Sequence, residues 1–306
     1  MKFSIYQESR RGARQYNQDR IGYCYSRDAL LIVVADGMGG HAHGEIAAEI
    51  AVQHFTEAFR REANPTLADP LQFLGRTMTG AHHAIAAGAV DRGLAQSPLT
   101  TCVACVVQNN AACWAHAGDS RLYHIRDGTI VAQTRDHSHV QRLIDQGRMR
   151  EQAFAAHPAR NQIYNCLGSP DPPQLDLSGK TRLQAGDTLI LCTDGLWSPL
   201  SGRIIGSAVQ KSGITKAMPQ LLDQAEQRAG RQCDNLSVIA VAWEEDSQAE
   251  PADRVSSGAA QQTAAIKQPE DFSVAQAQNS DLSDVEIERA IAAIRSAFNR
   301  TPNGKT

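Results

Sequence analysis

The chain has 306 residues and 42% of them are apolar, so it is long enough for one large domain or two small ones with a sizeable core. Its formal net charge is −3 at pH 7, which provides no strong basic field for nucleic acid or for an anionic membrane surface. The first residues lack a signal-peptide pattern and no apolar run has transmembrane length, so we expect a cytoplasmic protein without membrane insertion and without a nucleic-acid partner.

The predicted elements are short strands interrupted by pairs of helices. Strands are predicted at residues 19–25, 30–35, 101–108, 111–117, 121–126, 129–133, 189–193 and 237–243. Helices are predicted at residues 44–61, 70–90, 138–147, 203–212 and 217–229. The polar breaks QNNA and RDGT join neighbouring strands as hairpins, which favours antiparallel pairing. This order predicts an α+β fold in which two sheets pack face to face and helices cover them outside.

The seven cysteines are odd in number and mostly lie in apolar, strand-like runs. This pattern is typical of reduced core residues rather than of a disulfide framework. Cys102 and Cys105 form a CxxC pair, but residues three apart in a strand point to opposite faces. We therefore expect no zinc or redox site at this pair.

The composition of the chain changes near Glu245. Residues 246–280 are polar, rich in Ala, Gln, Ser and Asp, and lack a core pattern, which predicts a disordered linker. Residues 281–306 are predicted to be a tail with a short amphipathic helix that begins near Ser283. That helix could fold back on residues 1–245 or dock onto a partner, and the sequence does not separate these alternatives.

Aspartates recur where predicted strands begin or end. Asp36 follows the apolar run 30–35, and an Asp-Gly turn would explain it alone. Further aspartates at strand ends are harder to explain as turns, and they are Asp19, Asp119, Asp194 and Asp234. If these strand ends converge, carboxylates about 4 Å apart repel by roughly 1 kcal/mol in water and by roughly 4 kcal/mol at an effective dielectric near 20. Divalent cations bound between the carboxylates would replace this repulsion with attraction. Oxygen ligands select a hard ion such as Mg²⁺ or Mn²⁺.

A family resemblance rests on several of these segments in order. RGARQYNQD, VVADGMGGHAHGEIAA, AHAGDSRLYHIRDG, TRDHSHVQRLIDQG, LCTDGLW and CDNLSVIAV resemble the motifs of metal-dependent protein phosphatases, the PPM or type 2C family, in its bacterial serine/threonine form. The resemblance covers roughly residues 3–243. It implies a four-layer α-β-β-α sandwich with two central, mainly antiparallel sheets, and residues 1–245 as the catalytic domain.

The resemblance also implies a centre of two Mn²⁺ or Mg²⁺ ions, with a third, weaker ion. Asp36 would bridge the two ions and the carbonyl of Gly37 would bind one of them. Asp194 and Asp234 would hold the other ion, and Asp119 would be a ligand of the third ion together with Asp194.

Other residues are implied to act around these ligands. Asp19 would orient metal-bound water, and Asn235 would fix the loop that carries Asp234. Arg14 would bind the substrate phosphate, a task that suits its planar fork of donors. Together with Asp36 and Asp194, Arg14 and Asp19 are thus the implied catalytic residues.

The sequence departs from the family pattern at some positions. Gln18 stands where some members have a glutamate, and Met38 stands where eukaryotic members have a histidine thought to protonate the leaving group, so that role is unassigned. His41 and His43 are interpreted as polar loop residues rather than its replacements. Thr100 and Thr101 are interpreted as structural. Arg148, Arg150 and Arg160, in the region of the family's flap, could meet acidic or phosphorylated substrate or could be solvated surface.

We therefore expect a phosphoprotein phosphatase that hydrolyses phosphoserine and phosphothreonine by attack of a metal-bridging hydroxide. The implied partners are phosphorylated proteins, targets of a cognate bacterial serine/threonine kinase, and we expect a monomer. Two alternatives stay open: another phosphoester substrate or a regulatory role on the same fold, and a catalytically silent phosphoprotein-binding module.

Overall fold

The computed structural model describes residues 1–38, 43–150, 157–160, 162–244 and 275–276. Contacts divide the chain into two units, residues 1–276 and 277–306, and the second lies outside the described residues. The tail helix predicted for 281–306 is therefore outside them too, as is most of the predicted linker. Two residues of that linker, Ala275–Gln276, form strand β12. The domain boundaries stay predictions.

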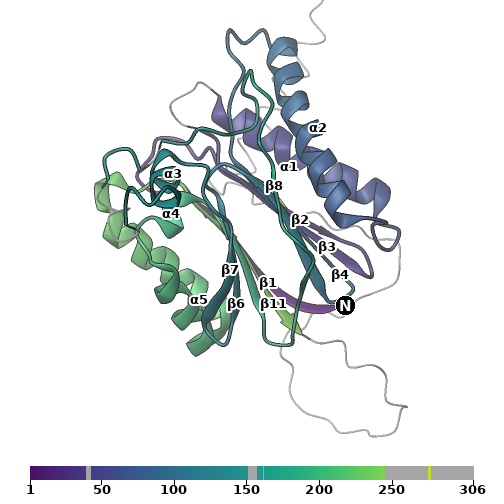
Figure 1. Cartoon of the computed structure of the whole chain (residues 1–306), viewed down its shortest axis with the longest axis vertical. Coiled ribbons are helices and arrows are strands. Elements are labelled where there is room, and N and C mark those ends of the chain that lie inside the picture. The colour runs from purple at the N-terminus through teal and green to yellow at the C-terminus, as the bar shows by residue number, and fades with distance from the viewer. Residues whose placement is uncertain (39–42, 151–156, 161, 245–274, 277–306) are drawn as a thin grey trace, which may run out of the picture. The chain divides into compact units, whose positions relative to one another are not determined.

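Two antiparallel sheets lie at the centre of residues 1–244 (Figure 1). The first has the order β1-β11-β10-β6-β7, with bounds Lys2–Arg10, Leu236–Glu244, Thr188–Cys192, Arg121–Arg126 and Thr129–Gln133. The second has the order β12-β2-β3-β4-β5-β8, with bounds Ala275–Gln276, Arg20–Tyr25, Ala29–Ala35, Cys102–Gln108, Ala111–Ala117 and Asp176–Leu177, and β9 (Thr181–Arg182) also pairs with β5. The predicted mainly antiparallel pairing is confirmed.

Helices cover the outer face of each sheet (Figure 1). The second sheet packs against α1 (Gly44–Glu62) and α2 (Pro70–Asp91), and the first against α4 (Asp194–Trp197) and α5 (Gly202–Ala229). The described residues also contain α3 (His139–Asp145) and the 3₁₀ turn η2 (Gly230–Gln232). The α+β sandwich predicted from the sequence is therefore confirmed, with one apolar core outside each sheet and buried strand faces between them.

Strand β3 is buried on both faces. Leu31, Val33 and Ala35 belong to the core under α1 and α2, whereas Ile32 and Val34 point the other way and are also fully buried. Strands β2 and β4 are hydrogen-bonded to its two edges. This position explains why the sequence of β3 is continuously apolar instead of alternating.

The hairpin and helix predictions agree with the structure in detail. Asn109 and Asn110 have positive φ between β4 and β5, and Asp127 does so before Gly128 between β6 and β7, as two-residue turns of the I′ type require. The helices predicted at 203–212 and 217–229 are the two halves of α5, which is interrupted at Gly213, where φ is 68°.

The cysteine prediction is also confirmed. All seven cysteines are free and buried. On β4, Cys102 faces the core under α1 and α2, whereas Cys105 is buried but is not part of that core, in accord with opposite faces.

Candidate metal centre

Five aspartates come together at one end of the two sheets. Asp36 follows β3 and Asp194 follows β10, while Asp19 precedes β2 and Asp234 lies two residues before β11. Because these strands are antiparallel, the end of one lies beside the start of its neighbour. Asp119 lies in the turn from β5 to β6 at the same end. The sequence-predicted ligands are thus assembled from both sheets.

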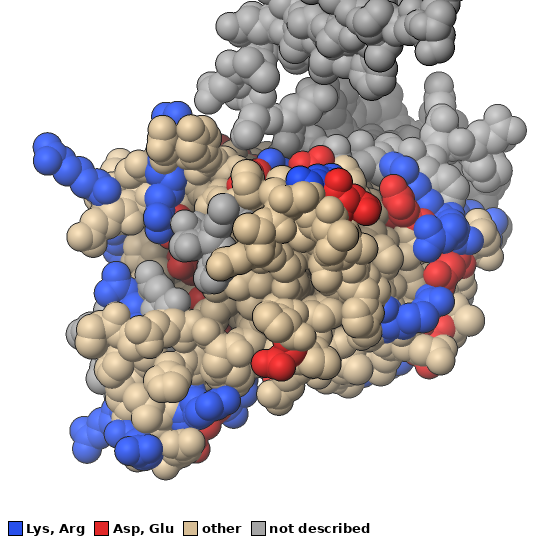
Figure 2. Space-filling model, turned by 90° about the horizontal axis from the view of Figure 1, so that it is seen from above, with Lys and Arg blue, Asp and Glu red and all other residues tan. Residues whose placement is uncertain are grey.

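A cavity of about 610 Å³ lies at this end of the sheets and is lined by four of the five aspartates, all except Asp19. It is lined by Asp36, Gly37, Asp119, Asp194 and Asp234, and also by Arg14. On the face seen from above, acidic atoms lie inside a hollow that has basic side chains around it (Figure 2). The volume is within the roughly 300–1,000 Å³ that ligand pockets usually have.

The backbone around Asp36 is fixed by two threonines. Thr100 Oγ1 donates to the Asp36 carbonyl oxygen at 2.8 Å, and the Thr101 N–H donates to the same oxygen at 2.9 Å. The Asp36 N–H donates to Thr101 Oγ1 at 3.3 Å. These bonds use the backbone of Asp36 and leave its carboxylate for a ligand, so the structural interpretation of Thr100 and Thr101 agrees with their contacts.

Gly37 is a site of close backbone packing. A Cβ at Gly37 would lie 2.4 Å from the backbone carbon of Gly44, at the start of α1, and 2.6 Å from the carbonyl oxygen of Gln18. A Cβ at Gly44 would in turn lie 2.7 Å from Gly37. The two glycines therefore let three segments meet at the cavity, which is a use of glycine that needs no positive φ.

Asn235 holds the loop that leads to β2. Its Nδ2 donates to the carbonyl oxygens of Arg11 at 2.8 Å and Tyr16 at 2.9 Å, and its Oδ1 accepts from the Gln18 N–H at 2.9 Å. The Asn235 N–H donates to Asp234 Oδ1 at 2.8 Å. One nearly buried amide thus connects the Asp234 turn to the segment that carries Arg14.

Arg14 itself is exposed and directed toward the aspartates. Its Nη2 lies 2.5 Å from Asp234 Oδ2. Its pKa is raised above the ordinary value, chiefly by this hydrogen bond, with the charges of Asp194 and Asp36 also contributing. Arg14 therefore presents a cation at the mouth of an acidic cavity.

The remaining carboxyl groups are costly to ionise in the absence of cations. Burial, together with the charge of Asp234, raises the pKa of Asp19 to about 6, although Thr193 Oγ1 donates to it at 2.9 Å. Burial and the charge of Asp136 raise the pKa of Asp119 to about 7, against the opposing effect of Arg121. For Asp36 and Asp194, burial and the neighbouring aspartates raise the pKa well above its usual range.

Within the described residues, two buried oxygens of this cluster have no hydrogen-bond partner, Asp19 Oδ1 and Asp194 Oδ1. Unpaired buried acceptors that carry negative charge are strongly unfavourable unless a cation binds nearby. Several carboxylate oxygens without nitrogen or sulfur donors are the donor set of Mg²⁺ or Mn²⁺. The residues therefore fit hard divalent cations.

A second group of potential ligands, His116, His137 and Asp176, lies elsewhere among the described residues. The Nδ1 atom of His137 accepts from the Gly118 N–H at 3.2 Å and from Asn165 Nδ2 at 2.5 Å. In the neutral ring the hydrogen is therefore on Nε2, which lies 3.3 Å from Asp176 Oδ2. A protonated Nε2 cannot bind a metal ion, so this group does not fit a metal site.

Other predicted positions have clear locations. Gln18 donates to Glu45 at 3.0 Å, and the Met38 N–H donates to the Leu99 carbonyl oxygen at 3.0 Å. His43 precedes α1, 3.7 Å from Glu45, and His41 lies outside the described residues.

Arg148, Arg150 and Arg160 differ in position. Arg160 lines a second cavity beside Asp194, whereas Arg148 and Arg150 are exposed and line neither cavity. Sequence reasoning did not identify Thr193, although a polar residue that ends an apolar strand directly before Asp194 was a possible signal.

Comparison with known proteins agrees with this arrangement. Residues 6–237 match the family model of protein phosphatase 2C, so the chain belongs to that family. The serine/threonine protein phosphatase PstP of Mycobacterium tuberculosis is 32% identical over 232 residues, which are 76% of this chain and 43% of that protein. The chain therefore spans less than half the length of this relative.

Solved structures show the same fold. The crystal structure of the serine/threonine phosphatase Stp1 from Staphylococcus aureus has a TM-score of 0.74 at 28% identity, over 80% of this chain and 96% of that one. The catalytic domain of PstP in complex with two manganese ions has a TM-score of 0.67 at 30% identity, over 80% of this chain and 99% of that one. These neighbours are serine/threonine phosphatases, as the sequence motifs predicted.

Proposed function

We propose that this chain is a Mn²⁺- or Mg²⁺-dependent phosphatase that removes phosphate from phosphoserine and phosphothreonine in proteins. The observation that carries the proposal is the set of Asp36, Asp119, Asp194 and Asp234 around one cavity, with Asp19 close to them. Among the described residues, one buried oxygen of Asp19 and one of Asp194 have no hydrogen-bond partner. Such a cluster is unfavourable without cations, and the homologous catalytic domain described above binds two manganese ions.

The chain would hold the ions through oxygen atoms only. Asp36, the Gly37 carbonyl, Asp194 and Asp234 would be ligands of the two principal ions, and Asp119 with Asp194 would be ligands of a third. Bound ions would activate the water that attacks phosphorus and would provide the positive charge that the phosphoryl oxygens need.

The protein's own groups would position the substrate and the water. Arg14, with its guanidinium at the mouth of the cavity, would bind two phosphoryl oxygens through its planar fork. Asp19, held by Thr193, would accept a hydrogen bond from water through its unpaired Oδ1. Asn235 would hold Arg14 and Asp19 in fixed positions through its bonds to the loop that precedes Asp19.

The cellular setting follows from the proposed activity. Phosphoproteins made by a cognate serine/threonine kinase would be the substrates, and a cytoplasmic monomer would act on them. None of the helices within the described residues has the length and apolar character needed to cross a membrane.

Hydrolysis of p-nitrophenyl phosphate and of a phosphothreonine peptide would test the proposal. We expect both reactions to need Mn²⁺ or Mg²⁺, to stop with a chelator, and to be abolished in Asp194→Asn. Calorimetry with Mn²⁺ alone provides a second measurement, in which the variant should bind more weakly. Folded protein that binds Mn²⁺ but hydrolyses neither substrate would instead favour a silent phosphoprotein-binding module.

A further inference from the structure

A second cavity, of about 580 Å³, adjoins the metal centre and is basic. It shares Arg14, Asp194 and Asp234 with the first cavity. Three further arginines line it, from separate parts of the chain: Arg160, Arg228 at the end of α5, and Arg231 in η2. Among its described lining residues the only carboxylates are the two shared aspartates, which bound cations would neutralise.

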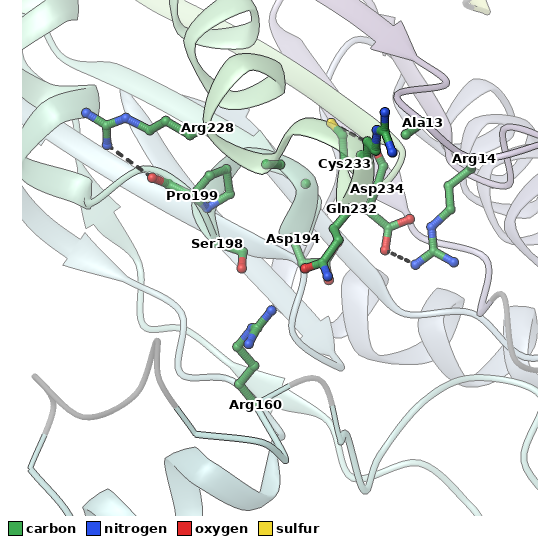
Figure 3. Close-up of a pocket in the computed structure, with 13 residues that line it drawn as sticks. Ala13, Arg14, Arg160, Asp194, Ser198, Pro199, Arg228, Gln232, Cys233 and Asp234 are labelled. Carbon is green, nitrogen blue, oxygen red and sulfur yellow. Dashed lines mark hydrogen bonds and ion pairs between the residues drawn. The ribbon is translucent and has the colours of Figure 1, made fainter.

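The arginines differ in how they are engaged. Arg14 is paired with Asp234, and Arg228 Nη1 donates to the Pro199 carbonyl oxygen at 3.2 Å (Figure 3). Within the described part of the chain, no hydrogen bond or ion pair involves the guanidinium group of Arg160 or of Arg231. Figure 3 shows the side chain of Arg160 directed toward Asp194 and Ser198. Two cations thus line the cavity, and no described residue is a partner for their charge.

We propose that this basic pocket binds a second phosphate group of the substrate, a few residues from the phosphate that is hydrolysed. The inference rests on the proposed function and specifies its substrate class: proteins phosphorylated at two nearby residues. Arginine guanidinium groups match phosphate oxygens in pairs, and a phosphate carries about twice the charge of a carboxylate at neutral pH. Because the two cavities share a wall, an extended peptide that advances about 3.3 Å per residue would reach both within a few residues.

A peptide panel would test this inference. It would contain a phosphothreonine peptide, and the same peptide with a non-hydrolysable phosphonate analogue of phosphothreonine one, two or three residues away on either side. A third series would have glutamate at the second position. At the best spacing we expect kcat/KM about tenfold above the singly phosphorylated peptide, and a smaller gain with glutamate.

Single variants would assign the effect to the pocket. Arg160→Gln and Arg231→Gln should each reduce the gain about threefold, while hydrolysis of the singly phosphorylated peptide and of p-nitrophenyl phosphate changes less than twofold. Arg61→Gln, which alters an exposed arginine on α1 over the other sheet, is the matched control and should leave the gain intact.

The outcomes separate this inference from the proposed function. Turnover of the single phosphopeptide without any gain from a second phosphate, or a gain that survives both substitutions, overturns the inference and leaves the phosphatase activity standing. An equal gain from glutamate overturns the assignment to phosphate. If no peptide is hydrolysed, fluorescence anisotropy can measure peptide binding instead. Tighter binding of the doubly phosphorylated peptide than of the singly phosphorylated one, lost in Arg160→Gln and Arg231→Gln, supports the pocket. Equal binding of the two peptides refutes it.

Discussion

Replacement of one buried carboxylate should stabilise the metal-free protein. Asp119 is 6% exposed and its pKa is raised to about 7 from an ordinary 3.8, first by burial and then by Asp136. The contribution of the protonated Asp119 carboxyl group to the free energy of unfolding is therefore fully present below pH 3.8 and is lost as the pH rises to 7. At 1.36 kcal/mol per pKa unit the loss is about 4 kcal/mol at pH 8. In EDTA, Asp119→Asn should be roughly 3–4 kcal/mol more stable than wild type at pH 8, and the gain should shrink toward pH 4.

Urea denaturation at a series of pH values measures this difference. Asp171→Asn, which neutralises an exposed carboxylate in a loop, is the control and should give little change. With saturating Mn²⁺ the advantage of Asp119→Asn should disappear, because bound cations remove the repulsion that the substitution relieves. A destabilised variant at pH 8 in EDTA, or an advantage that is equal with and without Mn²⁺, would refute the repulsion argument.

Three further predictions concern the segments around the cavity. Asn235→Ala removes three hydrogen bonds to the loop of residues 11–18, so the free energy of unfolding measured in urea should fall by about 2–4 kcal/mol. A loss below about 1 kcal/mol would mean that other contacts hold the loop. Gly37→Ala places a methyl group 2.4 Å from the backbone of Gly44, so we expect more than about 3 kcal/mol of destabilisation or loss of folded protein, and a wild-type melting curve would contradict this packing. Arg14→Lys keeps the charge but loses the planar fork of donors, so kcat/KM for a phosphopeptide should fall about tenfold while the circular dichroism spectrum stays unchanged. Unaltered kinetics would exclude a two-point contact between Arg14 and the phosphate.

Much of the architecture was predictable because the strands have strong local signals. The apolar run of β3 and the turns at Asn109–Asn110 and Asp127–Gly128 each determine their conformation within a few residues. Strand β1 was not predicted, because none of its nine residues is fully buried and its pairing depends wholly on β11, over 200 residues away in sequence. Its conformation is fixed by a tertiary contact, which no local pattern contains.

The candidate site divides in a similar way. The aspartates were identified because charge directly beside an apolar strand is a conflict visible in the sequence. The support of Thr193 for Asp19 was not, since a threonine at a strand end is ordinary and its partner lies 174 residues away. Of the basic pocket, only Arg160 was considered as a possible substrate contact, because Arg228 and Arg231 look like separate solvated residues until the chain is folded.

Strand β3 gives the metal centre a rigid support that the neighbouring basic pocket lacks. It is hydrogen-bonded along both edges and enclosed on both faces, and it therefore holds in place the backbone that leads to Asp36. The basic pocket, by contrast, is built from a half-buried arginine on a loop and from exposed arginines at a helix end and in a short turn. Descendants of such a protein could exchange those arginines for other residues, and thereby acquire new targets, without any rearrangement of the ion-binding carboxylates.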